Sequence, residues 1–156
     1  MMARALELAA RAGETGEVPV GAVVYETGTG RVLGEGVNTR EHAREPWGHA
    51  EFLAVQAACA AIGDWRLNHC TLAVTLEPCP MCAGLLVNAR VGRVVYGAAD
   101  PKAGAVNSLY EMLTDDRLNH RCGVISGVMA EESGELLRAF FRGLREKGPG
   151  KADREG

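Results

Sequence analysis

Apolar residues return at helical or at strand intervals along most of the chain, and these two periods predict its elements. Helices are predicted over residues 2–13, 49–62, 80–89, 108–113 and 133–147. Strands are predicted over residues 19–25, 31–37, 71–76, 93–97 and 123–129, which are short apolar runs bounded by turn residues. The order α-β-β-α-β-α-β-α-β-α predicts a mixed five-stranded sheet with helices on both faces.

Two helices carry an apolar face that we expect to pack in the core. In the helix over 49–62 this face consists of Phe52, Val55, Cys59 and Ile62. In the helix over 133–147 it consists of Leu136, Leu137, Phe140 and Leu144. Between the elements, residues 38–48 are predicted to form a loop, and a Gly-Thr-Gly turn joins the first two strands as a hairpin.

With 156 residues, the chain is long enough for one domain and too short for two. We place this domain at residues 1–147. The one linker-like segment lies at the end, where residues 148–156 are rich in glycine and charge and are predicted to form a flexible tail.

Composition narrows the possible classes of protein. Apolar residues make up 47% and charged residues 24% of the chain, as in ordinary soluble proteins, and the net charge of −3 disfavours indiscriminate coating of nucleic acid. A local basic patch that binds one particular RNA stays compatible with this charge. Because the sequence shows no membrane-spanning run and no signal-peptide core, we expect a cytoplasmic protein.

The five cysteines form an odd set in a chain without an export signal, which disfavours a disulfide scaffold. Two of them, Cys79 and Cys82, begin a predicted helix. Pro80 is suited to the first helical position, so Cys79 caps the helix and Cys82 follows within the first turn. The helix dipole there favours thiolates, so both sulfurs are suited to one metal ion. Cys59, Cys70 and Cys122 are expected to be small buried side chains.

His49 and Glu51 open another predicted helix. Two residues apart, they cannot share one lateral face of a helix, but both can reach a group that lies over its first turn. The sequence therefore predicts two helix N-termini that meet at one metal ion, held by His49, Cys79 and Cys82.

One histidine and two cysteines suit Zn²⁺, and three protein ligands leave a fourth position for water, as in catalytic zinc sites. Zinc lowers the pKa of such a water to about 7, and Glu51 is then placed to move protons. The alternatives for Cys-x-x-Cys are a redox pair, half of a zinc ribbon, or two core residues. A redox pair usually belongs to a thioredoxin-like unit, and a ribbon needs a second close pair that the chain lacks.

The segments His-Ala-Glu (49–51) and Pro-Cys-Pro-Met-Cys (78–82) match the signature of zinc nucleobase deaminases. Around them the chain resembles more narrowly the bacterial tRNA adenosine deaminases (the TadA family) of the cytidine/deoxycytidylate deaminase superfamily. The resemblance covers residues 2–147. It is carried by residues 17–23, 36–38, 75–84, 93–97, 100–104, 118–120 and 140–142.

This resemblance implies a three-layer α/β/α cytidine-deaminase-like fold and a homodimer with one Zn²⁺ per subunit. It also implies hydrolytic conversion of adenosine to inosine at the wobble position of a tRNA anticodon, with Glu51 as the catalytic proton carrier. Asn38 would bind the flipped base, and Ala50 and Glu77 would line its pocket. The residues implied near the anticodon loop are Asp100, Lys102, Phe141 and Arg142.

Trp47 departs from the family pattern, which usually has a small polar residue two positions before the zinc histidine. It is suited to stack on a base, worth about 1–3 kcal/mol, to pack as a hydrophobe, or to reshape the pocket for another substrate, and packing is slightly favoured.

Two alternative functions of the protein stay open. One is deamination of guanine or another free base or nucleoside, and the other is a non-enzymatic zinc-containing RNA-binding subunit, which the presence of Glu51 disfavours.

Overall fold

A computed structural model describes residues 1–146 and 148 of the chain. The helices are α1 (Met2–Glu14), α2 (Arg40–Ala43), α3 (Ala50–Ile62), α4 (Pro80–Asn88) and α5 (Ala130–Glu146). The strands are β1 (Gly21–Glu26), β2 (Val32–Val37), β3 (Cys70–Leu76), β4 (Arg93–Ala98) and β5 (Gly123–Ile125). The tail predicted over 148–156 lies, except for Gly148, outside the described residues, as does residue 147 at the end of the predicted domain.

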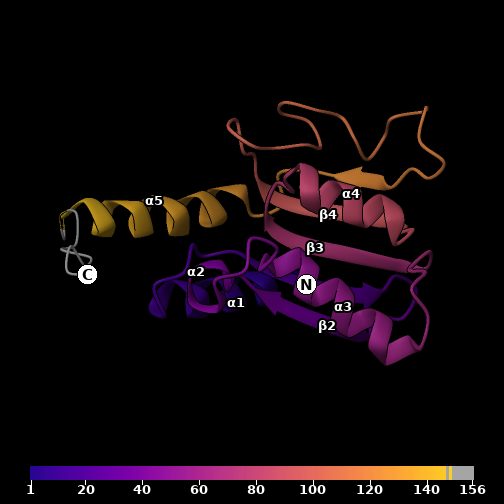
Figure 1. Ribbon diagram of the computed structural model, residues 1–156, viewed down its shortest axis with the longest axis horizontal. Helices are drawn as coiled ribbons and strands as arrows, with labels where there is room; N and C mark the ends of the chain where they lie inside the picture. Colours follow the sequence, from indigo (N-terminus) through magenta and orange to yellow (C-terminus); the bar gives the residue numbers. More distant parts are fainter. Residues whose placement is uncertain (147, 149–156) are drawn as a thin grey trace.

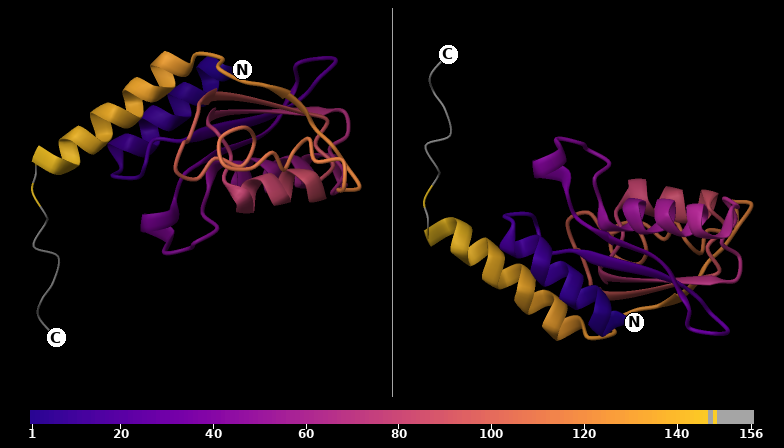
Figure 2. Two further views of the ribbon diagram at one scale, coloured as in Figure 1. Left: turned by 90° about the horizontal axis from the view of Figure 1, so that it is seen from above. Right: turned by 90° about the horizontal axis from the view of Figure 1, so that it is seen from below.

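The strands form one mixed sheet in the order β2-β1-β3-β4-β5. β1 pairs antiparallel with β2 and β3, whereas β3, β4 and β5 run parallel. Helices α1 and α5 lie side by side on one face of the sheet, and α3 and α4 cover the other (Figures 1 and 2). The predicted three-layer fold with a five-stranded mixed sheet is confirmed. Among the described residues, no helix is both long and apolar enough to cross a membrane.

Three predicted elements differ in the structure. The loop predicted over 38–48 contains the short helix α2, and the last strand ends at Ile125, before Gly127 and Met129 adopt positive φ. The helix predicted over 108–113 is wrong. Its backbone N–H groups bond outside the segment, since Leu109 donates to the carbonyl of Gly104 and Met112 to that of Ala105. These bonds to residues before the segment replace the ladder of i to i−4 bonds that a helix requires.

The buried face of α3 also differs from the prediction. Ile62 is exposed and Phe52 and Cys59 are half-buried, whereas the helix buries small side chains. The buried residues are Ala50, Glu51, Ala54, Val55 and Ala58. Glycines on β2 explain why α3 buries small side chains, because they let the helix backbone approach the strand closely. A Cβ added at Gly36 would lie 2.0 Å from the carbonyl oxygen of Ala50, and one at Gly34 would lie 2.2 Å from that of Ala54.

This close approach makes Gly36 sensitive to the smallest substitution. We expect Gly36→Ala to lower the free energy of unfolding by about 1–3 kcal/mol or more, because the added methyl must displace the first turn of α3. Urea unfolding measures the change. Gly28→Ala is the matched control, because no atom lies within 4 Å of a Cβ there. An equal, small effect of both substitutions would contradict the close packing.

The apolar face of α5 is less buried than predicted. Leu136, Leu137 and Phe140 are half-buried, Leu144 is exposed, and Ser133 is the buried residue of the helix. The first part of α5 packs on β4 and beside α1, and its last turns extend past the end of α1 and beyond the sheet (Figure 2). The prediction of a buried stripe is therefore wrong at Leu144, because no other element in the described part of the chain covers the end of the helix there.

Candidate active site

Two helix N-termini carry the cluster that the sequence predicts. His49 is the N-cap of α3 in an extended conformation, and Cys79 is the N-cap of α4, with Pro80 at its first turn. Cys82 lies in the same turn of α4 and is fully buried. Because β3 leads directly into α4 and β2 leads through residues 38–48 into α3, the sheet holds both N-termini in one place.

The ligand atoms of His49, Cys79 and Cys82 all lie within 4.8 Å of one another. Nδ1 of His49 is 3.6 Å from Sγ of Cys79 and 3.4 Å from Sγ of Cys82. In a tetrahedral zinc site with Zn–N near 2.1 Å and Zn–S near 2.3 Å, such atoms would lie about 3.6 Å apart. The three side chains are thus spaced to hold a metal ion of this kind.

The protonation of the cluster fits the same role. The hydrogen bond from the Cys82 thiol, together with that of His49, lowers the pKa of Cys79 to about 4. The same contact between the sulfurs, and then burial, raises the pKa of Cys82. Hydrogen bonding to Cys79 raises the pKa of His49. The lowered pKa of Cys79 favours its thiolate, which is the form of cysteine that binds a metal ion.

Glu51 lies in the first turn of α3, beside the cluster, and its side chain is only 4% exposed. Burial raises the pKa of Glu51 to about 6. A carboxyl group with a pKa near neutrality can both take and release a proton, which is what a general acid–base group requires.

A cavity of about 200 Å³ opens onto this cluster. Its volume is below the ~300–1,000 Å³ of pockets for drug-sized ligands, so it suits one flat base better than a whole nucleotide. Its walls are Val18, Val20, Asn38, Arg40, His49, Ala50, Glu51, Leu76, Glu77, Cys79, Asp100 and Ala103. Apolar side chains line much of it, and a few polar groups are available to orient a ligand.

The structure brings only some of the expected substrate residues to this cavity. Asn38, Ala50, Glu77 and Asp100 line it. Lys102, Phe141 and Arg142 instead line a separate surface depression, together with Leu137, Arg138 and Arg145 of α5. Trp47 is 51% exposed and lines neither, so the slightly favoured role as a packed hydrophobe is not seen within this subunit.

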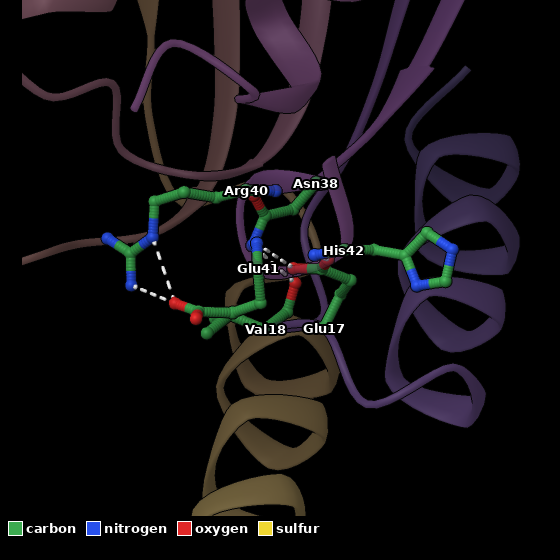
Figure 3. A network of polar contacts seen from close by, with 6 residues as sticks. All are labelled: Glu17, Val18, Asn38, Arg40, Glu41 and His42. Carbon is green, nitrogen blue, oxygen red and sulfur yellow. Dashed lines mark hydrogen bonds and ion pairs between the residues drawn. The ribbon is translucent and has the colours of Figure 1, made fainter. Parts of the chain in front are cut away.

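Sequence reasoning missed Arg40, which stands at the cavity wall two residues after Asn38. Its backbone N–H donates to Oδ1 of Asn38, and its guanidinium pairs with the exposed carboxylate of Glu41 (Figure 3). The only available signal was its closeness in sequence to Asn38. A charged residue in a predicted loop is too common for that signal to single it out.

The carboxylate of Glu77 is directed into the protein rather than toward a ligand. It accepts hydrogen bonds from the backbone N–H groups of Asp100, Val106, Asn107 and Ser108 and from the Ser108 hydroxyl. Burial would raise the pKa of Glu77, but these hydrogen bonds together lower it to about 2. Glu77 therefore ties residues 100–108 to the start of α4, and Gly104 leaves the space, since a Cβ there would lie 2.3 Å from the carboxylate.

This arrangement predicts how stability depends on pH. The folded pKa of about 2 lies below the usual 4.5, so the carboxylate stabilises the fold above pH 4.5, and this contribution, about 3 kcal/mol, is lost as pH falls toward 2. We expect Glu77→Gln to be clearly less stable at pH 7 and its deficit to shrink between pH 5 and pH 3, as measured by urea unfolding. Glu14→Gln, the same substitution at an exposed position on α1, is the control, and no comparable deficit is expected there. A deficit independent of pH would contradict the role of the charge.

The matching family model is that of the MafB19-like deaminases, which covers residues 1–145. The chain is 49% identical to a tRNA-specific adenosine deaminase of Bacillus subtilis, over 94% of this chain and 89% of that protein. It is 44% identical to a tRNA-specific adenosine deaminase of Haemophilus influenzae, over 94% of this chain and 84% of that protein.

A solved structure from a study of A-to-I editing by tRNA:A34 deaminases at the wobble position superimposes with a TM-score of 0.82. It is 42% identical and covers 87% of this chain and 97% of its own. A guanine deaminase from Nitrosomonas europaea superimposes with a TM-score of 0.78 at 24% identity, over 89% of this chain and 81% of its own. The second similarity concerns the fold alone.

Proposed function

This chain belongs to the family of tRNA-specific adenosine deaminases, and from this premise we propose that it hydrolyses adenosine to inosine at the wobble position of a tRNA anticodon. The observation that carries the proposal is a buried proton carrier, Glu51, beside a three-ligand cluster at the base of a cavity of about 200 Å³. Because this cavity admits one base, the substrate base must leave the RNA stack to react.

We assign the metal ion to His49, Cys79 and Cys82, and we propose one Zn²⁺ per subunit. The donor set of one imidazole and two sulfurs and the spacing of its atoms support this choice of metal. When bound, Zn²⁺ supplies a Lewis acid that makes a water molecule reactive near neutral pH.

Residues around the cavity then transfer the protons and bind the base. Glu51 accepts one proton from the attacking water and delivers it to N1 of adenine while the water oxygen bonds to C6. It then moves the second proton of that water to the amino group, which leaves as ammonia when its bond to C6 breaks. Asn38 lines the cavity wall and is only 8% exposed, and its amide can hydrogen-bond the edge of the base there. Ala50 and the backbone of Glu77 complete the wall.

Outside the cavity, we propose that the RNA contacts the basic depression between residue 102 and α5. Lys102, Arg138, Arg142 and Arg145 give it positive charge, and the exposed ring of Phe141 offers a stacking surface. Asp100 lies between this surface and the cavity, and its carboxylate accepts hydrogen bonds from the backbone of Lys102 and Ala103. Exposed Trp47 is a further candidate for base stacking.

We also propose that the enzyme is a homodimer that acts in the cytoplasm, where mature tRNA is available. Large apolar side chains exposed on one subunit support an interface. They include Met81, Leu109, Tyr110 and Leu118. Sedimentation equilibrium measures the assembly directly, and a monomer at all concentrations tested would overturn the dimer.

The deciding experiment compares substrates. The purified protein is incubated with tRNA anticodon stem-loops that carry adenosine at the wobble position, and separately with guanine, adenine, cytosine and cytidine. We expect the protein to form inosine in the stem-loop and to deaminate none of the four free compounds. Ammonia from guanine, with none from the stem-loop, would overturn the RNA substrate in favour of a free-base deaminase. No deamination of any substrate by metal-loaded protein would favour a non-enzymatic subunit.

A further inference from the structure

Glu17 is a buried carboxylate that the proposed reaction does not use. It precedes β1, is only 2% exposed, and belongs to none of the ion pairs among the described residues. Its two oxygens accept hydrogen bonds from the backbone N–H groups of Glu41, at 3.2 Å, and His42, at 2.6 Å (Figure 3). Burying a carboxylate without a cation is costly, so these two bonds must offset its lost hydration.

The backbone hydrogen bonds of residues 39–48 close this segment on itself, as from the N–H of Thr39 to the carbonyl of Gly48, whereas those to Glu17 join it to the chain before β1. Helix α2 buries none of its residues, and all four of its side chains are exposed. Hydrophobic packing therefore does not attach α2 to the domain. The hydrogen bonds to Glu17 come from the centre of this helix, and they tie it to the segment that enters β1.

The same two segments also fix the side chain of Asn38. Its Nδ2 donates to the carbonyl of Val18 at 3.3 Å, and its Oδ1 accepts from the backbone N–H of Arg40 at 3.3 Å. The partners of Asn38 thus directly neighbour Glu17 on one side and Glu41 on the other. Figure 3 shows these contacts as one network, with Glu17 across from Asn38. Asn38 lines the cavity with His49 and Glu51, so a shift of α2 changes how its amide faces a bound base.

We propose that Glu17 is a positioning residue for deamination, which orients the amide of Asn38 toward the substrate base by anchoring residues 41–42 to the start of β1. The proposal rests on the proposed function, because it assumes that the cavity binds a base. It adds a residue that touches neither the cavity nor the metal cluster.

Glu17→Gln tests this role with almost no change in shape. Its amide NH₂ group would face a backbone N–H, so one of the two bonds is lost and the segment is released. We expect kcat/KM for the stem-loop to fall about tenfold, mainly through kcat, while metal content stays at the wild-type value. Glu14→Gln, the same change at an exposed position on α1, is the control and should leave kcat/KM unchanged.

A double-mutant cycle with Asn38→Ala separates positioning from general stability. If Glu17 acts through Asn38, Glu17→Gln lowers kcat/KM about tenfold in the wild-type background and less than twofold in the Asn38→Ala background. Equal factors in both backgrounds, or no effect in the first, would overturn the proposal. Should Glu17→Gln fail to fold, Glu17→Asp, whose shorter side chain loosens the same bonds, enters the cycle instead. If wild type deaminates guanine and not the stem-loop, the proposed function fails, and the same cycle measured on guanine decides the role of Glu17.

Discussion

Glu51→Gln is expected to lower the rate of deamination by about 10²–10⁴-fold while the protein keeps its metal ion and its fold. Glutamine has the shape of glutamate but cannot accept a proton from the attacking water or carry it to the base. Burial raises the pKa of Glu51 to about 6, so its carboxyl group holds a proton more readily in this site than a glutamate in bulk water does. Single-turnover assays of inosine formation measure the chemical step without product release.

Glu14→Gln again serves as the control, because it removes the same charge at an exposed position at the end of α1. Its rate should equal that of wild type. Metal analysis of all three proteins separates loss of chemistry from loss of the metal ion. A Glu51→Gln protein that keeps its metal ion and at least a tenth of the wild-type rate would overturn the assignment of Glu51.

The group of three possible metal ligands, His49, Cys79 and Cys82, could be predicted from the sequence because its geometry is local. Pro80 fixes the start of α4, so the places of Cys79 and Cys82 in the first turn follow from helix geometry alone. The same holds for His49 at the cap of α3. Only the proximity of the two helix N-termini is a tertiary contact. It was predicted because one histidine and two cysteines together form a typical set of zinc ligands.

The parts that the sequence did not predict depend on contacts between distant segments. The partners of Glu17 lie 24 and 25 residues away, and those of Glu77 lie 23 to 31 residues away. The buried face of α3 depended on Gly34 and Gly36 of another element, which favour alanine over larger side chains at the contact. Periodicity within one segment does not contain this information, so it favoured Phe52 and Ile62.

Cys82→Ala is expected to remove the metal ion and, with it, all measurable deamination. Cys82 is fully buried, so alanine leaves a small apolar gap, whereas serine would bury a hydroxyl group without an assured partner. Loss of a direct ligand should weaken metal affinity by more than the ~10–100-fold that the loss of a supporting contact typically costs. Metal analysis after dialysis measures occupancy, and the inosine assay measures activity.

Stability gives an independent readout of the same site. A metal ion that binds only the folded chain raises its stability, so a chelator should lower the Tm of wild type. The chelator should leave the Tm of Cys82→Ala unchanged, because that protein has no metal ion to lose. Cys59→Ala, at a half-buried cysteine outside the cluster, is the control and should keep its metal ion, its activity and the response to chelator. A Cys82→Ala protein that still binds one metal ion per chain would show that Cys82 is not a ligand.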